Sequence, residues 1–322
     1  MEPYRAPWWL PGAHLQTIYP AVVLKPPRVP YRRSRWGTPD GDFIDVDRVE
    51  TPGAPGERAA PLVALFHGLE GGSSSHYALA LMHAVRARGW RGLVVHFRGC
   101  SGEPNLLPRA YHSGDTEELD WILRRLQAER EGAPLHAAGV SLGGNVLLKW
   151  LGERGAEASH YVARACAVSA PVDLVSAGAA LGAGFNLLYA RHFLATLKRK
   201  SARMLEAHPG LFRLERVLAA RTLREFDDVV TAPLHGFRDT DDYWARASSK
   251  PLLRHIAVPT LMVNARNDPF LPSRALPGPH EVSRAVALEF PDTGGHAGFV
   301  TGRFPGTLDW LPRRMLAHFA GN

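Results

Sequence analysis

The chain has 322 residues, 45% of them hydrophobic, and a formal net charge of +7. Of its 38 basic residues, 33 are arginines spread along the chain without an RNA- or DNA-binding motif, so the composition argues against a nucleic-acid-binding function. The two cysteines, Cys100 and Cys166, stand at unrelated positions and therefore indicate neither a disulfide scaffold nor a zinc site.

The sequence shows no clear targeting signal or membrane-spanning segment. The first residues, Met-Glu-Pro-Tyr-Arg, lack the basic start and apolar core of a secretory signal. The least polar long stretch, residues 174–190, is rich in Ala and Gly and is too short and too weakly apolar for a membrane span. We therefore expect a cytoplasmic protein.

Strand-like and helix-like runs alternate along most of the chain. The turn at residues 38–42 joins two strand-like runs, 32–36 and 43–49, in a predicted hairpin. Helices are predicted over 77–89 and from Asp115 onward, where apolar residues recur at helical spacing. Further strands are predicted at 61–66, 91–97, 134–139, 162–168, 258–264 and 285–290. This alternation predicts an α/β fold with a mostly parallel central sheet and helices on both faces.

One interval, from about residue 174 to 250, interrupts the alternation. It is helical in pattern and rich in arginine, and it contains no strand-like run. No linker or internal repeat separates it from the rest of the chain. We therefore expect a single domain over residues 1–322, with a helical segment inserted at about 174–250.

A candidate nucleophile lies where a predicted strand meets a predicted helix. There Gly139 and Gly143 flank Ser141 in the pattern G-x-S-x-G. In this context the pattern is typical of a nucleophile elbow, a sharp turn that presents one serine oxygen at its apex. The serine backbone is held in a strained conformation, and glycines two positions away relieve the crowding. The first amides of the following helix, beginning with Leu142, can stabilise an oxyanion.

Two partners for this serine follow in the chain. Asp268 lies in a polar turn after the strand at 258–264, and His296 lies in a glycine-flanked loop after the strand at 285–290. Upstream, the strand at 61–66 runs into a His-Gly loop whose Leu69 amide can serve as the second oxyanion donor. The order Ser, Asp, His is the chain order of α/β-hydrolases and differs from the orders of chymotrypsin-like and subtilisin-like proteases. An inserted segment at this point of that fold is a cap over the active site.

Each of these residues has a structural alternative. Ser141 could be an ordinary helix N-cap, and Asp268 could merely start an Asp-Pro turn. The flanking glycines and the order of the motifs favour the catalytic interpretation. Other polar residues are assigned structural roles, or lie on the wrong loops for this chain order: His67, His96, His112, Glu70, Cys100, Asp173 and Asp292.

Eight segments resemble those of the YheT-like α/β-hydrolases, at residues 9–17, 67–72, 97–105, 111–115, 236–244, 248–251, 264–270 and 294–299. The resemblance extends from about residue 8 to about 312. It implies that the family nucleophile falls on Ser141, the acid on Asp268 and the base on His296. The family includes bacterial esterase-like proteins and eukaryotic relatives resembling monoacylglycerol lipases, phospholipases and ester synthases, so the resemblance does not fix the substrate.

The expected function is that of a serine carboxylic-ester hydrolase with an acyl-serine intermediate. No HExxH, P-loop or strand-to-helix GxGxxG motif is present, so we expect no metal and no cofactor. Apolar residues of the inserted segment, including Phe185, Leu188 and Phe193, recur at roughly helical spacing and are candidates to contact the substrate. They favour medium-to-long acyl esters such as monoacylglycerol-like lipids.

Two other functions remain open. An acyltransferase would pass the acyl group to an alcohol, which product analysis with added ethanol would reveal. A catalytically silent binding protein would fail to react with a fluorophosphonate probe. The basic run at residues 198–200 with Arg203 could meet anionic headgroups or substrate phosphates in a transient membrane contact, but a solvated helix face is the favoured interpretation. The oligomeric state cannot be inferred.

Overall fold

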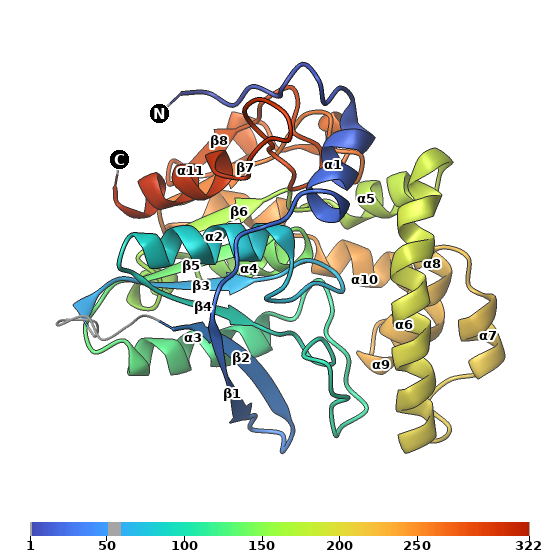
Figure 1. Cartoon of the computed structure of the whole chain (residues 1–322). Coiled ribbons are helices and arrows are strands. Elements are labelled where there is room, and N and C mark those ends of the chain that lie inside the picture. Colours follow the sequence, from blue (N-terminus) through green and yellow to red (C-terminus); the bar gives the residue numbers. More distant parts are fainter. Residues whose placement is uncertain (1, 51–58, 322) are drawn as a thin grey trace.

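Eight strands form one sheet in the computed structural model, which describes residues 2–50 and 59–321 (Figure 1). Their order across the sheet is β1-β2-β4-β3-β5-β6-β7-β8. The strands are β1 Tyr31–Gly37, β2 Phe43–Val49, β3 Leu62–Phe66, β4 Arg91–Val95, β5 Leu135–Val140, β6 Arg164–Val168, β7 Thr260–Val263 and β8 Val286–Glu289.

The sheet is mostly parallel. Strands β3 to β8 pair in parallel, whereas β2 is antiparallel to both β1 and β4. The turn between β1 and β2 is closed by a hydrogen bond from the Thr38 amide to the Asp42 carbonyl (2.9 Å). The predicted α/β fold is confirmed, and each strand falls within its predicted range except for one-residue extensions of β1 and β5.

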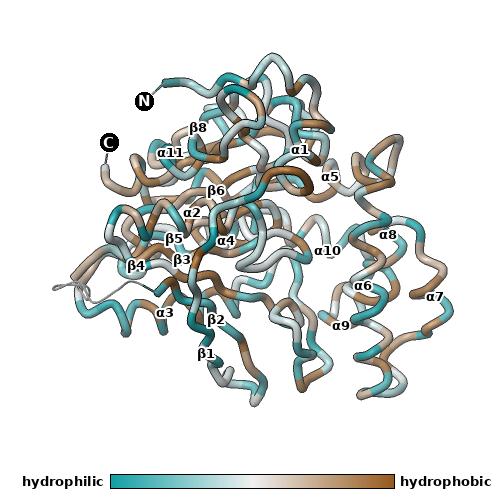
Figure 2. Tube along the Cα trace, viewed as in Figure 1, coloured by the Kyte–Doolittle hydropathy of each residue, from teal (hydrophilic) through white to brown (hydrophobic). Residues whose placement is uncertain are grey.

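Helices cover both faces of the sheet. On one face lie α2 (His76–Ala87) and α11 (Trp310–Phe319), and on the other lie α3 (Thr116–Glu129) and α4 (Leu142–Arg154) (Figure 1). Helix α3 buries Leu119, Ile122, Leu123 and Leu126, a stripe with the period of an amphipathic helix. Figure 2 shows β1 at the sheet edge as largely hydrophilic, in contrast to the central strands, whose side chains are buried on both sides.

A helical insertion, residues 174–247, separates β6 from β7. It contains α5 Leu174–Leu181, α6 Leu187–Ala207, α7 Leu214–Ala219, α8 Leu223–Phe226, α9 Ala232–Leu234 and α10 Thr240–Ala247. Helices α6, α7 and α8 stand beside the sheet rather than on either face (Figure 1). Leu194, Val217, Phe226 and Val230 form a small core of their own within it. No helix in the part of the chain that the structure describes is long and apolar enough to cross a membrane.

The N-terminal segment forms a helix, α1 (Ala13–Val22), which lies against the insertion and the loop after β8. The sequence pattern predicts neither this helix nor α11. Helix α1 has a glycine in place of a side-chain cap at its start and a proline, Pro20, inside it, so the usual start signal is absent and a helix breaker is present. Its position depends on tertiary contacts instead.

Candidate active site

The turn between β5 and α4 places Ser141 at the edge of the sheet. Its backbone is in the left-handed region, with φ 53° and ψ −122°. A Cβ added at Gly139 would lie 2.5 Å from the Gly143 carbonyl oxygen, and one added at Gly143 would lie 2.4 Å from the Phe66 carbonyl oxygen. Both glycines are therefore required for this turn to form, which is the geometry of a nucleophile elbow.

Ser141, His296 and Asp268 form one hydrogen-bonded chain. The His296 Nε2 atom lies 2.9 Å from Ser141 Oγ, and its Nδ1 atom lies 2.9 Å from Asp268 Oδ2. The Asp268 side chain is fully buried, and its other oxygen accepts the amide of Phe270 at 2.8 Å. The Phe270 ring stacks on the imidazole with a centroid distance of 4.1 Å. The imidazole is therefore held in the orientation that a general base for Ser141 needs.

The loop that carries His296 is held from the other end of the chain. Thr17 Oγ1 of α1 accepts the His296 amide at 2.9 Å, and Gln16 Oε1 accepts the Gly294 amide at 2.9 Å. A Cβ added at Gly298 would lie 2.0 Å from the Gln16 carbonyl oxygen, so the loop and α1 touch backbone to backbone. The sequence does not predict these contacts directly. Its one indirect sign is that the two contacting segments, 9–17 and 294–299, are both among those that resemble the YheT-like family.

The two proposed oxyanion donors lie on either side of Ser141. Leu142 is the first residue of α4, and Leu69 follows Gly68, where an added Cβ would lie 3.0 Å from Ser141 Cβ. Within the described residues, no acceptor takes the backbone amide of Leu69 or Leu142. Both amides are thus free to bind an oxygen of a substrate at this serine.

His67 orients the peptide that carries one of these amides. The Phe97 amide donates to His67 Nε2 at 3.1 Å, so the proton of this buried imidazole sits on Nδ1, which donates to the Gly68 carbonyl at 2.7 Å. Burial lowers the pKa of His67 to about 3, so the ring is neutral. Because the carbonyl and the amide of a trans peptide point in opposite directions, this bond turns the Leu69 amide away from His67.

The other polar residues weighed in the sequence make local contacts. Asp173 caps α5 by accepting the Ser176 amide, and the Asp292 side chain is 94% exposed beside Arg266. His96 binds Asp47 at 2.8 Å, and His112 accepts the Gly114 amide at 3.2 Å. Burial raises the pKa of Cys100 to about 11, so its thiol stays protonated. No group of His, Cys, Asp and Glu within residues 2–50 and 59–321 is arranged to hold a metal ion.

A cavity of about 930 Å³ opens beside Ser141 and His296. This is near the upper end of the usual range for small-molecule sites. Helices α5, α6 and α8 of the insertion supply much of its apolar wall: Leu174, Ala177, Leu181, Phe193, Leu197 and Phe226. The insertion thus contributes apolar surface to the cavity beside the serine.

Of the three expected substrate contacts, only Phe193 lines this cavity. Phe185 and Leu188 do not line it: their side chains are 49% and 54% exposed, and Phe185 packs on His14 of α1. Helical spacing identifies an apolar stripe without revealing which way it faces. Phe185 also precedes α6, in a short 3₁₀ turn.

A half-buried aspartate, Asp227, adds a polar group to the insertion's side of the cavity. Thr231 Oγ1 donates to it at 2.6 Å and Trp244 Nε1 at 2.9 Å. Burial raises the pKa of Asp227 to about 6. The sequence gives no sign of this group, since an aspartate in a helical segment is ordinarily a surface residue.

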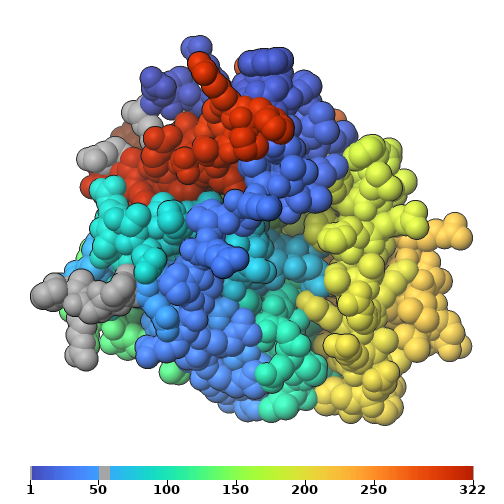
Figure 3. All heavy atoms as spheres, viewed as in Figure 1, coloured from blue at the N-terminus to red at the C-terminus, as the bar shows by residue number. Residues whose placement is uncertain are grey.

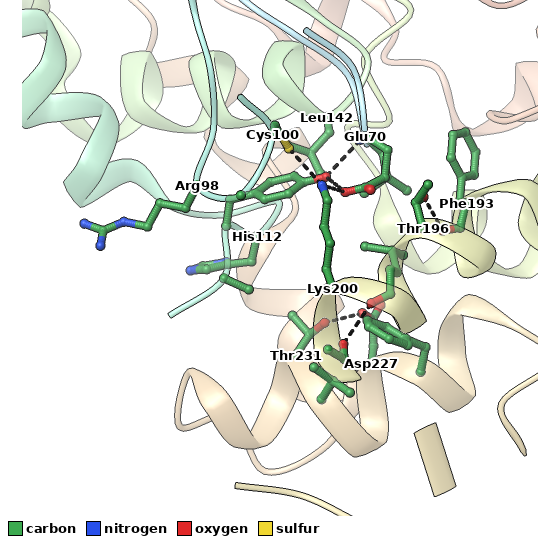
Figure 4. A pocket seen from close by; sticks show the side chains of 18 of the residues that line it. Glu70, Arg98, Cys100, His112, Leu142, Phe193, Thr196, Lys200, Asp227 and Thr231 are labelled. Carbon is green, nitrogen blue, oxygen red and sulfur yellow. Dashed lines mark hydrogen bonds and ion pairs between the residues drawn. The ribbon is translucent and has the colours of Figure 1, made fainter. Parts of the chain in front are cut away.

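An ion pair across the cavity connects the insertion to residues 67–72, the loop that carries the Leu69 amide. Lys200 Nζ of α6 binds Glu70 Oε1 at 2.7 Å, next to Cys100 Sγ at 3.4 Å (Figure 4). Glu70 follows Leu69 directly, has φ 56°, and binds Tyr111 through both its amide and its side chain. The position of the Leu69 amide is thereby tied to α6.

Replacing Lys200 by methionine is expected to lower kcat for a short ester by roughly tenfold with little change in KM. The Leu69 amide is expected to bind the oxyanion of the transition state, and small displacements of such a group cost large factors in rate. Steady-state kinetics on p-nitrophenyl butyrate would measure both kcat and KM. Lys198→Met is the matched control, because among the described residues Lys198, on the same helix, binds only the Leu218 carbonyl. Equal kcat values for the two variants would contradict the role given to Lys200.

Comparison with known proteins agrees with this geometry. A family model described as alpha/beta hydrolase fold matches residues 61–303. The chain is 41% identical over 306 residues to a putative esterase, YheT, of Escherichia coli (strain K12), covering 94% of this chain and 89% of the relative. It is 31% identical over 320 residues to phospholipase ABHD3 of Mus musculus, covering 97% and 77%.

A solved esterase structure from Pyrococcus furiosus superposes with a TM-score of 0.57 at 14% identity, covering 93% of this chain and 98% of that chain. At this identity, the superposition shows only that the two folds are similar. The 41% identity to YheT and the match to the family model show, in addition, to which family the chain belongs. The chain therefore belongs to the α/β hydrolase fold family and, within it, to the YheT-like ester hydrolases.

Proposed function

We propose that this ester hydrolase acts through Ser141 as nucleophile, His296 as general base and Asp268 as the acid that orients the imidazole. The observation that carries the proposal is the hydrogen-bonded chain of these three side chains, 2.9 Å at each link, beside a largely apolar cavity of about 930 Å³. The strained elbow and the two unoccupied amides beside it supply the remaining parts of a serine esterase.

The geometry implies the following sequence of steps. His296 Nε2 takes the proton of Ser141 as Oγ attacks the ester carbonyl, and Asp268 stabilises the imidazolium through Nδ1. The amides of Leu69 and Leu142 bind the oxyanion, an effect worth roughly 3 kcal/mol per donor. His296 then protonates the departing alcohol, which leaves an acyl-serine. A water molecule, deprotonated by the same histidine, releases the carboxylic acid.

We propose in addition that residues 174–250 act as a cap on a single catalytic domain, and that the substrate is a medium-to-long acyl ester. The apolar wall of the cavity supports this, since an acyl chain gains about 0.8 kcal/mol for each CH₂ it buries. A monoacylglycerol-like lipid has such a chain and a small polar alcohol, and the similarity to proteins named esterase and phospholipase is consistent with it.

The kcat/KM for p-nitrophenyl esters is expected to rise from acetate toward medium-chain acyl groups, by up to about fourfold for each added CH₂, until the cavity is full. Phe193→Ala should flatten this rise, because the side chain lines the cavity. Leu188→Ala is the control, being exposed on the same helix. A profile that peaks at acetate, or one that the two variants change alike, would refute the assignment of the acyl site.

A further inference from the structure

Large hydrophobic side chains are exposed mainly on one part of the molecule. The described residues contain eleven such side chains that are well exposed, and eight of them come from three short segments. We call these eight the apolar surface: Trp8, Leu15, Val22, Val23, Phe185, Leu187, Leu188 and Phe304. Trp8 is 91% exposed, and Val22 and Phe304 are about three-quarters exposed at 75% and 74%. Clustering of this kind marks an interaction site, whereas scattered exposed residues do not.

The N-terminal segment contacts each of the other two. The Phe185 ring lies 4.2 Å from the ring of His14, and the Trp9 ring lies 5.4 Å from that of Phe304. The Tyr19 hydroxyl donates to the Pro305 carbonyl at 2.9 Å. Figure 3 shows the N-terminal residues, in blue, lying between the C-terminal part of the chain, in red, and the start of the insertion, in yellow-green. The apolar surface is therefore built on α1 and its two neighbours.

Charge within the stretches that carry the apolar surface has a single sign. Residues 3–39, 174–205 and 293–308, which contain the three segments, include no aspartate or glutamate, although the whole chain has 31 acidic residues. Eight cationic side chains in these stretches are exposed and make no ion pair within the described residues: Arg5, Lys25, Arg28, Arg32, Arg191, Arg199, Arg203 and Arg303. The stretches that carry the surface thus combine exposed apolar side chains with exposed cations and contain no carboxylate.

We infer that this surface docks onto an anionic lipid bilayer. Exposed Trp and Phe side chains enter the boundary between headgroups and acyl chains, and lysine and arginine beside them meet lipid phosphates. The absence of acidic residues fits this partner, because a negatively charged membrane repels carboxylates and attracts each cation near it.

The position of the surface relates to the catalytic site. Helix α1, which carries Leu15 and Val22, also holds the His296 loop through Gln16 and Thr17. A bound bilayer would lie beside the element that supports the histidine, so the enzyme would work where lipid esters are concentrated. Docking goes beyond the proposed function and does not depend on the catalytic role of Ser141.

Sedimentation with vesicles tests the inference on the full chain. Vesicles of phosphatidylcholine mixed with phosphatidylglycerol should bind the protein, and vesicles of phosphatidylcholine alone should bind it more weakly. The double variant Val22→Glu/Phe304→Glu should lose about tenfold or more of this binding while keeping its turnover of a soluble short ester. The matched control is Leu106→Glu/Leu218→Glu, which charges two exposed side chains outside the surface and should bind as the unchanged protein does.

Three results would overturn the inference. The first is no binding to the mixed vesicles, and the second is an equal loss of binding in the two double variants. The third is self-association that Val22→Glu/Phe304→Glu abolishes without any vesicle binding, which would assign the surface to a second copy of the chain. The Ser141→Ala variant should bind vesicles normally, so failure of the proposed chemistry and failure of docking are separate outcomes.

Discussion

Replacing Ser141 by alanine is expected to lower ester turnover by about 10⁴-fold or more while the protein remains folded. Loss of a triad nucleophile removes the covalent route and leaves only the oxyanion donors and substrate binding. Alanine retains the Cβ atom, so the packing at the elbow, where Gly68 lies close to that atom, is unchanged. Initial rates on a p-nitrophenyl ester and labelling by a fluorophosphonate probe would both measure the loss.

The control for this variant is Ser159→Ala, which removes an exposed hydroxyl bound only to the Ala156 carbonyl. It should keep full turnover and full labelling. Thermal melting of both variants should match that of the unchanged protein, which separates a chemical defect from a folding defect. Near-normal turnover by Ser141→Ala would rule out the proposed nucleophile.

Replacing Gly143 by alanine is expected to destabilise the protein by about 3 kcal/mol or more, or to prevent folding. The new Cβ would lie 2.4 Å from the Phe66 carbonyl oxygen and 2.6 Å from that of His67. Both are backbone atoms at the end of a central strand, so neither can yield as the tip of a side chain would. Chemical denaturation followed by circular dichroism would measure the change.

Gly37→Ala is the matched control, because a Cβ at Gly37 meets nothing within 4 Å. Its stability should stay within about 0.5 kcal/mol of the unchanged value. A Gly143→Ala protein as stable as Gly37→Ala would mean that α4 and β3 are not packed as closely as the elbow requires. The same contact explains why the second glycine of the motif lies two residues after the serine.

Much of the sheet can be predicted from the sequence because its strands are short apolar runs that end in polar turns. Strand β3 is one such run, and its side chains are all buried. The three catalytic candidates could likewise be placed, since each lies in a loop at a strand's carboxyl end, and parallel strands bring those ends to one edge. Their 2.9 Å spacing follows from the fold rather than from local sequence.

Contacts between distant segments could not be predicted. Lys200 and Glu70 are 130 positions apart, and nothing near either residue indicates the other. Likewise Phe185 and Phe193 have similar side chains in neighbouring stretches, yet one packs on α1 and the other lines the cavity. Such differences depend on how the insertion packs against the rest of the molecule, which local secondary-structure propensity does not determine.

The support that α1 gives to the His296 loop has a consequence for the order of synthesis. Gln16 and Thr17 are made 278 and 279 residues before Gly294 and His296, whose amides they accept. The Tyr4 hydroxyl likewise donates a hydrogen bond to the carbonyl of Val300, a residue that is made 296 positions later. A nascent chain can pair its early strands as they emerge from the ribosome, but α1 has no histidine loop to hold until residues 294–296 have been made. The candidate site is therefore not assembled in the growing chain before residue 296 has left the ribosome.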